Sequence, residues 1–138
     1  MDRQVVLQKL DSLRRCIQRI EAKCPADVKV LQADVDLQDI VALNLSRAVQ
    51  LAVDIGAHLI AVMDVPPPGT MGQTFELLGR EGVVDASLAE RLKKAVGFRN
   101  IAVHSYESID WAIVHKIARD HLHEFSDYAG AVLRWLQR

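Results

Sequence analysis

Apolar residues recur along this chain three and four positions apart, which is helical rather than alternating spacing. The spacing runs through residues 6–20, continues from about residue 34 to 62, and returns between 110 and 136. Prolines, which interrupt helices, occur only at Pro25 and in the run at 66–68, outside these segments. The pattern predicts an all-α chain, and its first stripe consists of Val6, Leu10, Leu13, Ile17 and Ile20.

Capping residues mark where the predicted helices begin. Thr70 precedes MGQTFELLGR as the N-cap of a short third helix, and Asp85 or Ser87 opens a fourth helix that continues into residues 97–106. Asp110 caps a final helix of about 25 residues. Helices of this length joined by short loops favour an antiparallel bundle. We therefore expect about five helices in a single helical domain over residues 1–138.

Composition and charge narrow the class of protein. Half of the residues are hydrophobic, and 17 basic against 18 acidic side chains leave a net charge of −1. No basic excess holds a nucleic acid by bulk electrostatics, so any contact with RNA must be local. The chain has no run of about eighteen apolar residues and no signal peptide, so we expect a soluble cytoplasmic protein with no membrane partner. Cys16 and Cys24, about 12 Å apart along one predicted helix, should be reduced thiols.

The stretch GFRNIAVHSY, residues 97–106, places several hydrogen-bonding side chains in a mostly apolar segment. Arg99 and Tyr106 are seven residues apart, so on an unbroken helix they share a face and continue the inward stripe of the fourth helix. His104 points about 140° away from Arg99 on an ideal helix, but the long arginine stem can swing toward it. One interpretation is a guanidinium and an imidazole that converge on one pocket. The other is a structural salt bridge of Arg99, a satisfied imidazole at His104 and a packed Tyr106.

Other polar residues are weaker candidates. Asn100 can orient a phosphate or bond to the local backbone. Asn44 interrupts the apolar stripe of the second helix and can either support the motif or make a core hydrogen bond. Arg91, Lys93 and Lys94 can form a basic rim for RNA or a solvated helix face. The histidine spacings match no chelating pair on a helix, so we expect neither a metal nor a cofactor.

The segment RNIAVHSY resembles the arginine, asparagine, spacer, histidine, any residue, tyrosine motif of the HEPN superfamily, and specifically of its HepT branch. Two longer stretches are similar as well: DLQDIVALNLSRAVQLAVDIGAHLIA resembles the family's long second helix, and FELLGREGVVDASLAERLKKAVGF resembles the stretch that leads into its motif. The resemblance covers residues 34–125. Ala102 stands where a larger aliphatic residue is more usual, a departure that concerns packing rather than chemistry.

The resemblance implies a homodimeric helical bundle that acts as a metal-independent endoribonuclease. It also implies a role as the toxin partner of MntA, a minimal nucleotidyltransferase antitoxin. Residue by residue, Arg99 and His104 fall on the catalytic pair of the family. Tyr106 falls on the tyrosine that MntA-like partners modify by adenylylation (AMPylation).

Metal-free RNA cleavage is chemistry that these side chains can perform. A 2′-hydroxyl must lose a proton, the departing 5′-oxygen must gain one, and histidine exchanges protons near neutrality. Arginine presents a planar fork of donors to the phosphate. Because the motif has one histidine per chain, an acid and a base that are both imidazoles require two chains with His104 facing His104 across a two-fold axis. Two alternatives stay open: a non-enzymatic helical module that binds a nucleotidyltransferase, and a nucleotide-binding regulator.

Overall fold

The computed structural model describes residues 1–138 and consists of seven α-helices and one short 3₁₀ helix. No strand is present, so the predicted all-α class is confirmed. The elements are α1 (Arg3–Lys23), α2 (Val28–Ala33), α3 (Val35–Ile60), α4 (Met71–Arg80), α5 (Ala86–His104), η1 (Tyr106–Ser108), α6 (Trp111–Asp120) and α7 (His123–Leu136).

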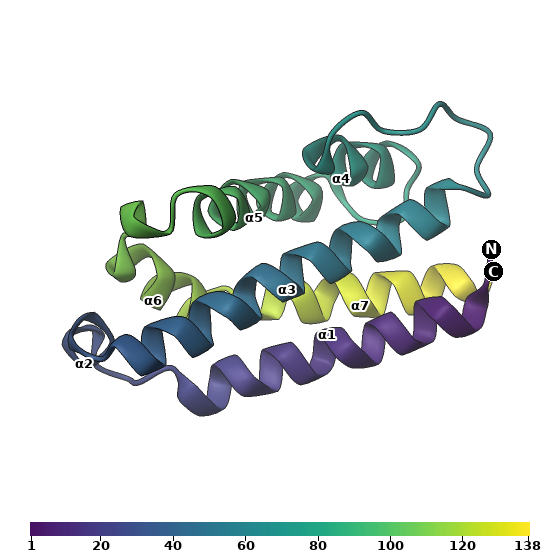
Figure 1. Ribbon diagram of the computed structural model, residues 1–138. Coiled ribbons are helices and arrows are strands. Elements are labelled where there is room, and N and C mark those ends of the chain that lie inside the picture. The colour runs from purple at the N-terminus through teal and green to yellow at the C-terminus, as the bar shows by residue number, and fades with distance from the viewer.

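Helix α3 is the central element of an elongated bundle (Figure 1). The helix α1 packs antiparallel along one side of α3, α4 and α5 pack along another, and α7 runs back beside α1 (Figure 1). The two chain termini lie side by side at one end, where Nη1 of Arg3 donates to the carbonyl of Leu136 at 2.7 Å. The predicted antiparallel bundle is therefore confirmed.

The core closes around Tyr128 of α7, whose side chain is fully buried. Its hydroxyl donates to the carbonyl of Ala52 on α3 at 2.7 Å, and its ring meets that of Phe75 edge to face at 5.8 Å. Gly56 permits the close approach of α4 to α3, because a Cβ atom there would lie 2.7 Å from Cγ2 of Thr74. These contacts hold α3, α4 and α7 together and so fix the support on which α5 lies.

Helices begin where the capping signals predict them. Asp34, Thr70, Asp85 and Asp110 each accept a hydrogen bond from a backbone amide in the first turn of the helix that follows. Of the two starts expected for the fourth predicted helix, the structure uses Asp85. The chain turns after α4 at Gly82, whose φ of 78° is a conformation that glycine adopts without strain.

The helix count differs from the expected five in two places. Asp27 caps the short helix α2 in the segment after Pro25, where the apolar pattern predicts no helix. The predicted final helix is divided into α6 and α7 by a break at His121 (φ −123°, ψ 3°). Both pieces contact α1 and α3, but α6 also packs against α2 and α7 also packs against α5. Because the apolar spacing is similar on both sides of such a break, the sequence pattern does not locate it.

Helix α3 is long and apolar enough to cross a membrane if length and composition alone are considered. Most of its apolar side chains face the core of the bundle, and more than half of its most apolar window is buried there. A central helix of a soluble bundle has this composition for that reason. The two cysteines, Cys16 and Cys24, are free and buried, as the sequence predicts.

Candidate functional site

The motif residues lie where α5 ends and η1 begins. The helix α5 continues through Arg99 to His104, and the backbone leaves the helical conformation at Ser105 (φ −146°, ψ 51°). Tyr106 starts η1, which is closed by a 2.8 Å bond from the amide of Ser108 to the carbonyl of Ser105. The expectation that Arg99 and Tyr106 share the face of one unbroken helix is therefore wrong, because this tight turn ends α5 before the chain enters α6.

Arg99 is half-buried and reaches across to α3. Its Nη2 donates to Oε1 of Gln50 at 3.1 Å, and its Nη1 donates to Oδ1 of Asn100 at 3.2 Å. The amide of Gln50 is oriented in turn by a 2.9 Å bond from its Nε2 to Oδ1 of Asp54. Both partners of Arg99 are neutral, and the guanidinium forms no salt bridge. Arg99 is thus held in place with its charge unneutralised and with further N–H donors available for an anion.

His104 is exposed at the last position of α5. No hydrogen bond joins it to Arg99, because the arginine turns toward α3 rather than along its own helix. Two apolar neighbours, Ile101 and Val103, are 44% and 52% exposed, so the imidazole lies beside an apolar surface rather than among charges. Within one subunit the two motif groups therefore do not meet.

Tyr106 is anchored to α3 by its hydroxyl, which donates a hydrogen bond to Oδ1 of Asp39. Its ring meets that of Trp111 edge to face at 5.9 Å. Burial of the ring, together with the hydrogen bond to Asp39 and its negative charge, raises the pKa of Tyr106 to about 12. The side chain is still 40% exposed, so it is a surface tyrosine held in one orientation and not a core tyrosine.

One stripe of α3 holds the side chains of Arg99 and Tyr106, and its residues are not among the candidates predicted from the sequence. Its members follow one another at intervals of four, four, three and four residues, which is a single helix face. Two of them hold Tyr106 and Arg99, through a carboxylate and an amide. A signal for them exists, because charged and amide side chains at helical spacing within an apolar helix indicate a face turned away from the core. The stripe consists of Asp39, Leu43, Arg47, Gln50 and Asp54.

The two asparagine candidates have different roles. Asn44 is only 8% exposed, and its Nδ2 donates to the carbonyl of Ile40 in its own helix at 2.8 Å. This is the core hydrogen bond that was one of its two expected roles. Asn100 accepts from Arg99 and so helps to orient the guanidinium.

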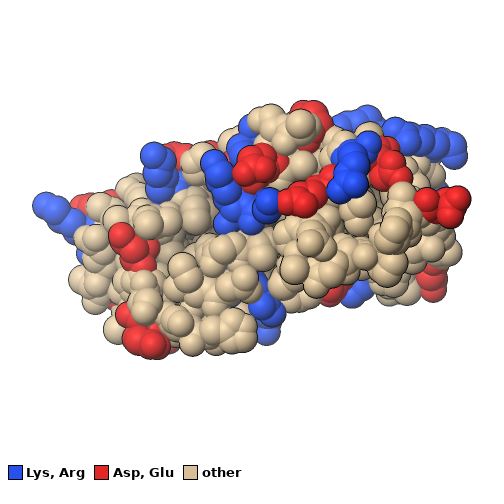
Figure 2. All heavy atoms as spheres, turned by 90° about the horizontal axis from the view of Figure 1, so that it is seen from above, with Lys and Arg blue, Asp and Glu red and all other residues tan.

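Two of the three basic residues that precede the motif are paired, whereas Lys94 forms no salt bridge. Lys93 forms a salt bridge with Glu76 of α4. Arg91 donates to Oγ of Ser87 at 2.6 Å and lies 3.3 Å from a carboxylate oxygen of Glu124. Charges of both signs are interspersed over this side of the molecule (Figure 2). Because carboxylates neutralise them, Lys93 and Arg91 form a paired helix face rather than a free basic rim.

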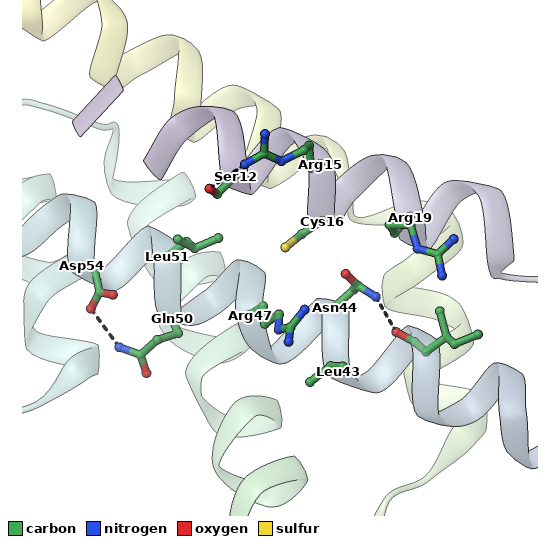
Figure 3. Close-up of a pocket in the computed structure, with 11 residues that line it drawn as sticks. Ser12, Arg15, Cys16, Arg19, Leu43, Asn44, Arg47, Gln50, Leu51 and Asp54 are labelled. Atoms are coloured by element: carbon green, nitrogen blue, oxygen red, sulfur yellow. Dashed lines mark hydrogen bonds between the residues drawn. The ribbon is translucent and has the colours of Figure 1, made fainter. Parts of the chain in front are cut away.

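A groove of about 620 Å³ lies between α1 and α3 (Figure 3). Arg15 and Arg19 of α1 and Arg47 of α3 are among the residues that line it. Gln50, the partner of Arg99, belongs to the same lining. The groove therefore begins beside the motif arginine, although its residues come from helices outside the motif.

The site combines three chemical capacities. A guanidinium held by amides can bind a phosphate, an exposed imidazole can exchange protons, and an anchored phenol can act as a nucleophile. No three histidine, cysteine, aspartate or glutamate side chains come close enough together to hold a metal ion.

Comparison with known proteins places this site in a family. A profile of the ribonuclease HepT-like family matches residues 13–132. The mRNA nuclease HepT of Shewanella oneidensis is 32% identical over 128 residues, which are 93% of this chain and 96% of that protein. The solved structure of a tri-AMPylated Shewanella oneidensis HEPN toxin in complex with MNT antitoxin has a TM-score of 0.89 at 31% identity, covering 97% of this chain and 99% of that chain.

A more distant structure shows how widely the fold is shared. The cytosolic protein YutE of Bacillus subtilis, whose function is unknown, has a TM-score of 0.86 at 17% identity, covering 99% of this chain and 92% of that chain. Similarity at that identity shows the fold alone. The family match, in contrast, spans most of the chain and includes the whole motif together with α3. The chain therefore belongs to the ribonuclease HepT-like family of HEPN proteins.

Proposed function

We propose that this protein is a toxin-type endoribonuclease that acts as a homodimer, without a metal ion, with Arg99 and His104 as its catalytic groups. The main support for the proposal is the environment of Arg99. Two neutral amides hold its guanidinium in place without neutralising its charge. The nuclease activity in the name of the Shewanella relative supports the same reaction class. The burial of more than half of the most apolar window of α3 inside the bundle supports a cytoplasmic location without a membrane partner.

The reaction follows from the groups available. The 2′-oxygen of the RNA attacks the adjacent phosphorus and loses its proton to one imidazole, while the bond from phosphorus to the 5′-oxygen breaks and that oxygen takes a proton from another. Such acid–base assistance contributes about 10² to 10⁴ in rate. Arg99 stabilises the charge that gathers on the non-bridging phosphate oxygens.

The second imidazole must come from a second chain. Each subunit has one motif histidine, and in the folded chain it lies at the exposed end of α5 beside Ile101 and Val103. Exposed aliphatic side chains next to a catalytic group are suited to burial against another subunit. A two-fold axis through this surface brings His104 to His104, so that one dimer forms one catalytic cleft.

A nucleotidyltransferase antitoxin of the MntA type neutralises the enzyme by AMPylation of Tyr106. The phenol oxygen attacks the α-phosphorus of a nucleoside triphosphate, and pyrophosphate leaves. Asp39 already accepts the hydrogen bond of the phenol and is placed to take its proton during the attack. The attached nucleotide adds negative charge and bulk over the face of α3 that also holds Arg99, and so obstructs the approach of the substrate. The tri-AMPylated state of the Shewanella toxin supports this mode of control.

RNA cleavage in excess EDTA tests the enzymatic proposal. The unmodified wild-type dimer should cleave single-stranded RNA, and Arg99→Ala and His104→Ala should each lose activity by about 10² to 10⁴. His123→Ala and Arg14→Ala, which change exposed residues outside the motif, are matched controls and should cleave as the wild type does.

The alternative function gives a different result in the same experiment. If the wild type and both motif variants are equally inactive, with the protein verified as dimeric and unmodified, the chain is a non-enzymatic helical module that binds a nucleotidyltransferase. Intact mass tests the antitoxin separately. Co-expression with the antitoxin should add mass in steps of one AMP to the wild type and none to Tyr106→Phe. An unchanged wild-type mass beside an active antitoxin would reject the modification.

A further inference from the structure

Three arginines line the groove between α1 and α3, and two of them form no salt bridge. Arg15 and Arg19 lie one turn apart on α1, about 6 Å along the helix axis, and Arg47 faces them from α3 (Figure 3). Arg15 is partly engaged, since its Nη1 donates to Oδ2 of Asp11 at 2.8 Å. Arg19 and Arg47 form no salt bridge. Two guanidinium groups at the groove are thus available to an anion.

The acidic side chain in the lining does not cancel this charge. Asp54 accepts the hydrogen bond of Gln50 and lies 3.8 Å from Nζ of Lys9. Burial raises the pKa of the Cys16 thiol, and the positive charges of Arg47 and Arg15, which line the groove with it, oppose that rise. The local surface is therefore positive on a chain whose net charge is −1.

The groove continues from the catalytic arginine. Gln50 accepts the hydrogen bond of Arg99 on one side of α3 and lines the groove on the other. Arg47 precedes Gln50 by three residues, less than one helical turn. A polyanion bound at Arg99 can therefore cross α3 over Arg47 and reach Arg19 and Arg15.

The shape and the lining favour a nucleic-acid backbone over a single nucleotide. Along α3 the lining extends from Ile40 to Asp54, a rise of about 21 Å, which is long enough for several phosphates. The lining contains no aromatic side chain on which a base could stack. Contacts with phosphates alone position a strand without reading its sequence.

We propose that Arg15, Arg19 and Arg47 form a phosphate-binding track that holds single-stranded RNA beside the scissile phosphate at Arg99. The inference rests on the proposed ribonuclease function and adds a substrate-binding surface that lies outside the motif. The track binds the backbone without sequence preference and contributes to affinity rather than to the chemical step. We name these three residues the arginine track.

Salt-dependent RNA binding tests the arginine track in a nuclease-silent His104→Ala background. The probe is a fluorescein-labelled oligouridylate of about 20 nucleotides, and its anisotropy is followed at several KCl concentrations. Each phosphate contact contributes about 0.7 to the slope of log K against log salt for a single strand. Replacing all three arginines by glutamine should reduce the slope by about 2 and weaken binding about tenfold or more at low salt. Arg14→Gln, the matched control, removes the same charge from α1 at a position outside the groove and should bind as the parent does.

Three outcomes would overturn the track. The first is that the triple variant binds RNA with the same salt slope and the same affinity as Arg14→Gln. The second is that analytical ultracentrifugation finds the triple variant to be monomeric. This result would mean that the groove is an interface between subunits. The third is loss of the folded circular dichroism spectrum in the triple variant, together with unchanged RNA binding by the folded single variants Arg19→Gln and Arg47→Gln.

Cleavage measured in the otherwise wild-type background separates the track from the nuclease proposal. If both hold, the triple variant has a higher KM and a kcat close to that of the wild type. If the wild type does not cleave but binding depends on the arginines, the nuclease proposal fails and the track stands. If wild type and triple variant cleave with the same KM, the nuclease proposal stands and the track fails.

Discussion

Replacing Asp39 by asparagine should make Tyr106 more acidic. Burial of the ring and the negatively charged Asp39 raise the pKa of Tyr106 to about 12, against about 10 for an unperturbed tyrosine. Asparagine keeps the size of the side chain and an oxygen that can accept the hydrogen bond, but it removes the charge. The contribution of burial remains, and it is the largest single cause of the raised pKa. We therefore expect the pKa in Asp39→Asn to fall between these two values.

The change in the pKa of Tyr106 can be measured because the chain has only two tyrosines. Tyr128 is fully buried and its hydroxyl is bonded to the carbonyl of Ala52, so burial raises its pKa beyond the range in which the folded protein is titrated. Tyrosinate absorbance before unfolding thus reports Tyr106, and Tyr106→Phe provides the blank. At pH 11 a phenol of pKa about 12 is about one-tenth ionised, whereas a fall of one unit makes it about half ionised, a fivefold larger signal.

The same substitution has a functional consequence. If Asp39 takes the proton of the phenol during nucleotide transfer, Asp39→Asn should slow AMPylation by about 10² or more, although its phenol ionises more readily. Asp39→Glu should restore part of the rate because it restores a carboxylate. A pKa in Asp39→Asn that stays at about 12 would refute the electrostatic reasoning. A full AMPylation rate in the same variant would refute the role of Asp39 as a base.

Three further predictions concern the fold and the support of the site. Gly56→Ala should lower the free energy of unfolding in urea by about 1 to 2 kcal/mol, because overpacking against Thr74 outweighs the gain in helix propensity; an unchanged midpoint would contradict this. Gln50→Leu should lower kcat about ten- to a hundredfold with a smaller effect on KM, since Arg99 loses the amide that positions it; a full kcat in a folded variant would contradict this. Because the pKa of Tyr128 is raised by folding, its contribution to stability is complete below about pH 10 and is lost as the pH rises further; urea unfolding at alkaline pH should show a steeper loss for the wild type than for Tyr128→Phe, and equal losses would contradict it.

Much of the fold follows from local rules that a single sequence displays. The caps at Thr70, Asp85 and Asp110 are visible because a capping side chain acts on amides two or three residues away. The apolar stripes predict an all-α bundle because each amphipathic helix must bury one face. Resemblance of the motif then identifies Arg99, His104 and Tyr106 as candidates, since they lie within eight residues of one another.

Features that depend on tertiary packing are the ones that the sequence does not predict. The final helix divides at His121, where α6 packs against α2 and α7 against α5, and the apolar period does not change there. Asp39 and Gln50 contact residues 67 and 49 positions away, and only the antiparallel packing of α3 and α5 brings them to the motif. The arginine track likewise needs α1 beside α3. None of these pairings has a spacing rule that can be recognised along the chain.

In the proposed enzyme two copies of His104 form one catalytic cleft, and the activity of mixed dimers shows whether both copies are needed. Wild type and His104→Ala are mixed in varying proportions at constant total protein, allowed to exchange subunits, and assayed for RNA cleavage in EDTA. If the cleft needs both imidazoles, only wild-type homodimers cleave, and an equal mixture retains about one quarter of the wild-type rate. A rate that falls in proportion to the wild-type fraction, to about one half in the equal mixture, would show that each subunit cleaves alone and would contradict the account.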